Sequence, residues 1–203
     1  MSDFKNIITI GREYGAGGRT VAKRLSQLLD IPFYDKDIIK LTAEQTGFSE
    51  EMIQATEESE AGRSFFNWFL PTGIASSYDK AIMAQAQTIR RIARQGPCIL
   101  VGRGADFILR DFPNLINVFI RAEEPDRIRY AVDTFGDTPE QAAKRVRHID
   151  ASRESYYHYL TRDKWGALTK YDLTLNSSHI GKEACADVII AYARAREAKE
   201  EKA

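Results

Sequence analysis

The chain has 203 residues, of which 43% are hydrophobic and 29% charged, so the composition predicts a single globular domain with a full core and excludes a largely disordered chain. The 29 basic and 29 acidic residues cancel, which argues against a nucleic-acid partner, because such proteins usually carry a basic excess. No leader peptide or membrane-length apolar run is evident, so we expect a cytoplasmic protein without a membrane partner.

The first third of the chain begins with a strand, a glycine-rich loop, a helix and a second strand. Residues 7–10 are β-branched and apolar, and residues 11–18 are rich in glycine. Apolar residues then recur at helical spacing from Thr20 to Leu29, and residues 31–34 form another short apolar run. This order predicts a βαβ unit whose first loop precedes a helix N-terminus.

The same alternation continues along the chain. Three more apolar runs, at residues 98–101, 115–120 and 172–176, predict strands, and helical patterns begin near Asp37, Ala81, Pro125, Thr138 and Lys182. Short apolar strands that alternate with helices predict an α/β fold with a parallel sheet covered on both faces. In such sheets ligands bind at the carboxyl ends of the strands.

Residues 44–80 do not follow this pattern. The segment is acidic, and Phe65, Phe66, Trp68 and Phe69 cluster just before Pro71. Such a cluster is typical of a packed lid or of a subunit contact, so residues 65–69 are a candidate interface for a homo-oligomer.

The glycine-rich loop is the main candidate for a phosphate site. A P-loop reads G-x-x-x-x-G-K-[ST] between a strand and a helix, and its backbone N–H groups and helix dipole face an anion. The candidate donor-binding residues are Arg12, Gly15, Ala16, Gly17, Gly18, Arg19 and Thr20. Gly18 stands where the lysine is expected, so either an arginine supplies the missing charge or the loop binds phosphate without chemistry.

Several segments resemble the cytidylate-kinase-like family. They are ITIGREYGAGGRTVAKRLSQLLDIPFYDKDII at 8–39, VGRGAD at 101–106, RHIDASR at 147–153 and YDLTLN at 171–176. The resemblance implies a P-loop kinase fold with a five-stranded parallel sheet, a monophosphate-binding insertion at about 40–95 and a lid at about 138–168. It also implies ATP and Mg²⁺ as cofactors and a nucleoside monophosphate such as CMP as acceptor.

The chain departs from this family's pattern at two places. Cytidylate kinases read G-K-G-T where this chain has residues 17–20, although Thr20 remains as a candidate ligand for Mg²⁺ or phosphate. Their G-R-D motif after the third strand is matched at Arg103, but Gly104 follows and Asp106 comes two residues later. We still expect Arg103 to act in catalysis and Asp106 to meet the substrate.

The lid motif R-x-x-D-x-x-R is matched by Arg147, Asp150 and Arg153. Helical spacing predicts that the three side chains lie on one face of a helix. There the two arginines would stabilise the charge of a phosphoryl group, and Asp150 would orient the arginines or bind the nucleoside. The alternative is a solvated face held by salt bridges. Aromatic residues from Tyr156 to Trp165 can stack on a base or pack under the lid.

Asp35 and Asp37 follow the second strand, where the family's monophosphate site begins. They are candidates for binding the acceptor, and they can equally form a helix N-cap with an acidic first turn.

The sequence thus predicts a phosphotransferase in which Arg19, one residue beyond the absent lysine, supplies the cation, with Arg12 as its rival. Two alternatives stay open: a non-catalytic or regulatory nucleotide-binding module with a degenerate loop, and a P-loop kinase of another small molecule.

Overall fold

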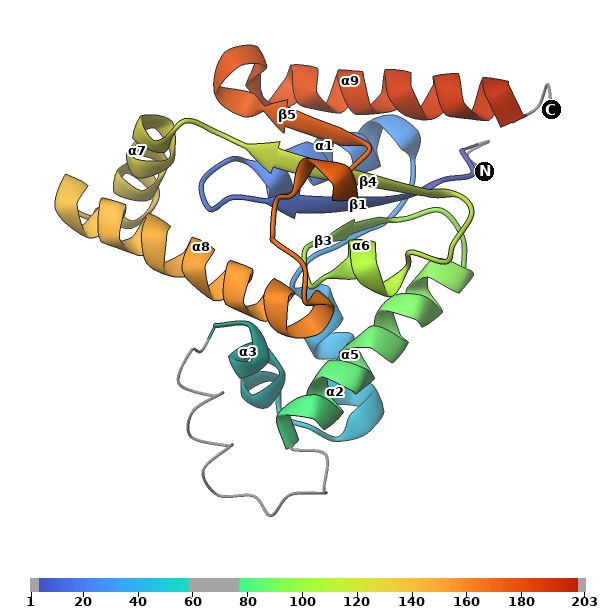
Figure 1. Ribbon diagram of the computed structural model, residues 1–203, viewed down its shortest axis with the longest axis horizontal. Helices are drawn as coiled ribbons and strands as arrows, with labels where there is room; N and C mark the ends of the chain where they lie inside the picture. Colours follow the sequence, from blue (N-terminus) through green and yellow to red (C-terminus); the bar gives the residue numbers. More distant parts are fainter. Residues whose placement is uncertain (1–3, 59–76, 201–203) are drawn as a thin grey trace.

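The fold is a five-stranded parallel sheet with helices on both faces (Figure 1). We obtained it as a computed structural model, which describes residues 4–58 and 77–200. The strand order is β2-β3-β1-β4-β5, and every strand pair is parallel. The chain crosses from one side of β1 to the other, so the loop after β1 lies at the switch point of the sheet, where α/β proteins bind ligands.

The element bounds are as follows. The strands are β1 (Ile7–Arg12), β2 (Phe33–Tyr34), β3 (Ile99–Val101), β4 (Leu115–Arg121) and β5 (Leu173–Asn176). The α-helices are α1 (Gly18–Leu29), α2 (Asp37–Thr46), α3 (Glu50–Glu58), α5 (Ser77–Arg94), α6 (Ala105–Ile108), α7 (Glu124–Phe135), α8 (Pro139–Thr161) and α9 (Ser177–Glu200), and a 3₁₀ turn spans Leu168–Lys170.

Each face of the sheet has its own core. Alternate residues of β1, such as Ile8 and Ile10, pack with α1 and α9 on one face. Ile7, which points the other way, packs with α2, α5 and α6 on the opposite face. The two-residue period of the strand thereby separates the layers seen in Figure 1.

The predicted α/β fold is confirmed, and the five strands form close to their predicted residues. The helix predicted from Lys182 begins earlier, at Ser177, and is interrupted at Gly181 (φ 79°, ψ 164°). The predicted helix start at Thr138 is also present, where a capping box joins Thr138 to Gln141.

Residues 44–80 contain the end of α2, α3 and the start of α5. These three helices contact one another, and α3 also contacts α8. The aromatic cluster at 65–69, our candidate subunit contact, lies outside the described residues. Within the described residues, no helix has both the length and the apolar character needed to cross a bilayer.

Candidate functional site

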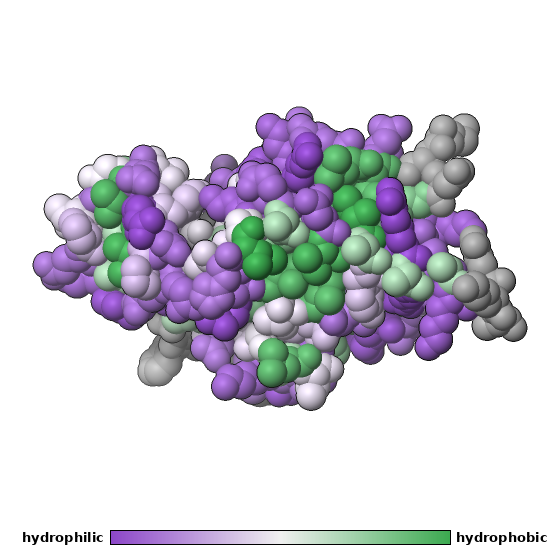
Figure 2. All heavy atoms as spheres, turned by 90° about the horizontal axis from the view of Figure 1, so that it is seen from above, coloured by the Kyte–Doolittle hydropathy of each residue, from purple (hydrophilic) through white to green (hydrophobic). Residues whose placement is uncertain are grey.

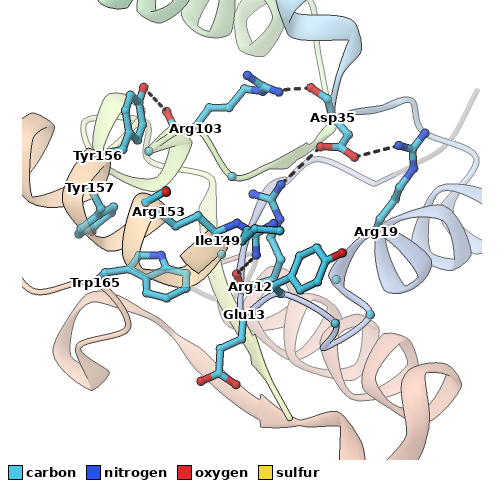
Figure 3. A pocket seen from close by; sticks show the side chains of 18 of the residues that line it. Arg12, Glu13, Arg19, Asp35, Arg103, Ile149, Arg153, Tyr156, Tyr157 and Trp165 are labelled. Carbon is cyan, nitrogen blue, oxygen red and sulfur yellow. Dashed lines mark hydrogen bonds and ion pairs between the residues drawn. The ribbon is translucent and has the colours of Figure 1, made fainter. Parts of the chain in front are cut away.

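A cavity of about 670 Å³ lies at the carboxyl ends of β1, β2 and β3, beside α8 (Figure 3). It has the size of a small-molecule site. The sequence-predicted residues that line it are Arg12, Gly15, Gly17, Gly18, Arg19, Thr20, Asp35, Arg103, Asp106 and Arg153. The predicted residues outside its lining are Ala16, Asp37, Arg147 and Asp150. Asp37 lies in the first turn of α2, as the helix-start alternative predicted.

Arg12 crosses the glycine loop beside Gly18. A Cβ atom on Gly18 would lie 2.7 Å from the Cβ of Arg12 and 2.9 Å from its Cγ. Farther along, a Cβ atom on Gly102 would lie 1.6 Å from Nη1 of Arg12. Both glycines therefore leave room for the Arg12 side chain, which starts next to the position where a P-loop lysine would begin.

Asp35, at the end of β2, connects three arginines in the cavity (Figure 3). Its buried carboxylate lies 3.5 Å from Nη2 of Arg12 and 3.2 Å from Nη1 of Arg19. Nε of Arg103, a buried residue, donates a hydrogen bond to the Asp35 backbone carbonyl at 3.1 Å. Arg19 is mostly exposed, whereas the Arg12 side chain is only 19% exposed, so Arg12 is the more buried of the two candidate cations.

Asp150 fastens the glycine loop to α8. Its Oδ1 accepts a hydrogen bond from the backbone N–H of Tyr14 at 2.7 Å, and its Oδ2 is paired with Arg127 of α7. Arg153, one turn later on α8, lies 3.6 Å from Asp150 and donates to the Arg12 carbonyl at 3.1 Å. Sequence reasoning found Asp150 and Arg153 but missed Arg127, because no local pattern marks a contact between separate helices.

The prediction that Arg147 shares a helix face with Arg153 is wrong. Arg147 and Arg153 are six residues apart, which at about 100° per residue places them ~120° apart around the helix. Nη1 of Arg147 points to Glu124 of α7 at 3.5 Å, and its side chain is 63% exposed. Arg145, eight residues before Arg153, lines the cavity instead. Counting back two turns from Arg153 would have found it.

The far wall of the cavity is aromatic and includes the half-buried carboxyl group of Asp106. Tyr157 donates a hydrogen bond to Oδ2 of Asp106 at 2.7 Å. Burial raises the pKa of Asp106, and the hydrogen bond from Tyr157 partly opposes this shift. Burial and the neighbouring Asp106 also raise the pKa of the Tyr157 hydroxyl, which therefore stays protonated as a donor. Beside the Tyr157–Asp106 pair, the ring of Trp165 packs edge-on against Phe119, and the ring of Tyr171 packs against Phe119 at a tilt.

Thr20 fits a Mg²⁺ ion that arrives with nucleotide phosphates. It is an exposed residue in the first turn of α1 and lines the cavity. Mg²⁺ usually takes one or two protein oxygens and completes its octahedron with phosphate oxygens and water. Among the described residues, no group of three or more His, Cys, Asp or Glu side chains is placed to hold a metal alone. A metal ion at Thr20 would therefore need further ligands from a bound nucleotide or from water.

Pyrophosphate is expected to stabilise the fold. Gly17, in the left-handed conformation, precedes α1, and the first turn of α1 contains no acidic residue, so the helix dipole and the loop N–H groups favour an anion. Ligand binding at one hundred times Kd adds about 2.7 kcal/mol to the free energy of unfolding. A rise in melting temperature with pyrophosphate, at constant ionic strength, checks this. An unchanged melting temperature up to millimolar pyrophosphate would count against an anion site.

Solved structures with the same fold include kinases of small molecules. An uncharacterized protein from Eubacterium ventriosum ATCC 27560 is 26% identical, with a TM-score of 0.75 over 94% of this chain and 99% of that one. Shikimate kinase from Bacteroides thetaiotaomicron is 14% identical, with a TM-score of 0.55 over 93% of this chain and 98% of that one. A gluconokinase from Sinorhizobium meliloti 1021 is 12% identical, with a TM-score of 0.53 over 98% of this chain and 97% of that one. The two kinases share the fold of this chain.

Sequence comparison assigns the family. Among curated proteins, no sequence matches the chain. The model of the cytidylate kinase-like family, in contrast, matches residues 7–179, which include the glycine loop, the Arg103 segment and α8. The chain therefore belongs to the cytidylate kinase-like family.

Proposed function

We propose that this chain is a phosphotransferase that moves the γ-phosphoryl group of ATP to a nucleoside monophosphate such as CMP. The main support for this proposal is the position of the Arg12 side chain. The stem of the Arg12 side chain lies beside Gly18 and its guanidinium group lies at Asp35, so the side chain spans the space between the glycine loop and the end of β2 in one cavity. A loop that only bound a phosphate would not need a cation in this position.

The chain would work by positioning and by neutralising charge. Backbone N–H groups of residues 15–20 would hold the donor phosphates, and Arg12 would face the oxygens that gain charge as the leaving group departs. Arg153 holds the Arg12 carbonyl and would complete the clamp from α8. Mg²⁺ held between Thr20 and the phosphates would add further charge neutralisation.

The acceptor would bind beyond Asp35. Arg19 and Arg103 lie there beside the Asp35 carboxylate and carbonyl, so the cations favour an anionic acceptor. The aromatic wall with Trp165 and the Tyr157–Asp106 pair offers a flat face and polar groups to a base. This arrangement supports a nucleoside monophosphate over a neutral sugar.

The second candidate is a regulatory nucleotide-binding module. Its support is the ion pair between Arg12 and Asp35, which already matches the charge of the Arg12 cation when no ligand is bound. Both candidates predict that the chain binds a nucleotide, but only the phosphotransferase predicts transfer of a phosphoryl group.

A screen of donors against acceptors separates them. ATP and GTP are each paired with CMP, UMP, AMP, shikimate and gluconate, and the phosphorylated product is followed by ³¹P NMR. Transfer to a pyrimidine monophosphate supports the proposal, whereas transfer only to shikimate or gluconate would replace its acceptor. Nucleotide binding without transfer in any pair would favour the regulatory module.

A further inference from the structure

The segment that begins α9 runs along the outer edge of the glycine loop. Ser177, a buried residue, donates a hydrogen bond to the Ala16 carbonyl at 2.8 Å. Figure 1 places the start of α9 and the loop between β1 and α1 at the same end of the sheet. The helical backbone is then broken at Gly181, and the next residue is Lys182.

The stem of Lys182 lies directly against Gly17. A Cβ atom on Gly17 would meet the Cε, Cδ and Cγ atoms of Lys182 at 2.7, 2.8 and 2.9 Å. Three successive carbons at nearly equal distance mean that the stem runs alongside the loop. Gly17 therefore makes room for Lys182 as Gly18 makes room for Arg12.

The ammonium group of Lys182 has no partner within the described residues. No hydrogen bond or ion pair joins it to residues 4–58 or 77–200, although the side chain is half-buried. Arg12, in contrast, is paired with Asp35, and Arg19 shares the same carboxylate. Lys182 is therefore a cation next to the loop with which no carboxylate of the described residues is paired.

We infer that Lys182 binds the phosphate chain of the donor nucleotide, adding from α9 a second cation to the guanidinium group of Arg12. The inference rests on the proposed function, in that the loop must bind a nucleotide di- or triphosphate. Arg12 extends from the end of β1 to Asp35, whereas the stem of Lys182 lies against Gly17. A phosphate chain held by the loop N–H groups would have a cation on each side.

The test compares Lys182→Met with Lys199→Met, using ADP as the probe in calorimetric titrations. Methionine keeps an unbranched apolar stem against Gly17 and removes the charge, and Lys199 is an exposed lysine near the other end of α9. The loss of a charged hydrogen bond weakens binding by about tenfold to a hundredfold, so K182M should raise the Kd for ADP by that factor. K199M should bind ADP as the wild type does.

A second measurement needs no variant. Reductive methylation of the wild-type protein, read by mass spectrometry, should modify Lys182 without ligand and should be slowed at Lys182 by ADP or pyrophosphate, with Lys199 unaffected. Equal ADP affinity in K182M and wild type, or modification of Lys182 that ADP does not slow, would overturn this inference alone. A wild-type protein that binds ADP but transfers no phosphoryl group would overturn the proposed function and leave the role of Lys182 standing. A wild-type protein that binds no nucleotide would overturn both.

Discussion

Replacing Arg12 by alanine is expected to lower turnover by about 10²–10³-fold, the usual effect of removing one preorganised donor to a developing negative charge. The affinity for ATP should fall less, because the backbone N–H groups of the loop remain. The reason is the position of the side chain, which starts beside Gly18, passes Gly102 and is paired with Asp35. Steady-state kinetics with the best donor and acceptor pair, with kcat and KM separated, measures both effects.

Arg147→Ala is the matched control for Arg12→Ala. It removes the same charge from the exposed side of α8, where Arg147 faces Glu124, so kcat should stay within about twofold of the wild type. A large loss of turnover in Arg147→Ala with none in Arg12→Ala would restore the lid arginine that the sequence motif predicted. A loss in Arg19→Ala alone would instead transfer the role of Arg12 to Arg19.

A double variant tests whether Arg12 replaces the P-loop lysine. Gly18→Lys alone should be impaired, because its Cβ would lie 2.7 Å from the Cβ of Arg12. Arg12→Gly combined with Gly18→Lys removes this clash and returns the lysine to its usual place. The double variant should recover much of the turnover that Arg12→Gly loses. Equal activity of the double variant and Arg12→Gly would contradict the replacement.

Replacing Asp150 by alanine is expected to destabilise the fold by roughly 2–4 kcal/mol, since breaking a buried ion pair leaves its partner charge uncompensated. The side chains of Arg127 and Asp150 are only 13% and 17% exposed. The variant also leaves the Tyr14 N–H without its acceptor, and Glu13, 3.7 Å from Nε of Arg127, is too distant to compensate fully. Urea denaturation followed by circular dichroism measures the free energy of unfolding.

Asp126→Ala is the control for this stability effect. Asp126 pairs with Arg129 on the exposed face of α7, and such surface pairs contribute about 0.2–1 kcal/mol. The two aspartates thus differ in burial and in the loop contact, but not in charge. Equal destabilisation by both substitutions would mean that Asp150 does not fasten the loop.

The sheet was predictable because its strands are short, mostly apolar runs that alternate with helical patterns. Ile7 and Ile8 illustrate this. They point to opposite faces of the sheet and both are buried, as expected for a parallel strand whose sequence does not alternate between apolar and polar residues. The start of α9 was harder, because Gly181 interrupts the helix and hides Ser177 from a periodicity argument. Short α6, of four residues, gave no periodic pattern to read.

The candidate site was predictable only in part. Arg12, Asp35 and Arg103 follow predicted strands, and the parallel sheet brings such positions together. Arg127 and Lys182 could not be predicted, because their contacts with the loop depend on how α7 and α9 pack rather than on neighbouring sequence. Arg19 was favoured over Arg12 by its place in the chain, yet Arg12 is the one whose side chain lies beside Gly18.

The most direct test of the account is phosphoryl transfer from ATP, labelled at the γ position, by the wild-type protein and by Arg12→Ala purified in the same way. The account predicts labelled product with a nucleoside monophosphate and equimolar ADP in the wild type, with transfer about 10²–10³-fold slower in Arg12→Ala although it still binds ATP. Tight binding of ATP by the wild type with no labelled product from any acceptor would contradict the account.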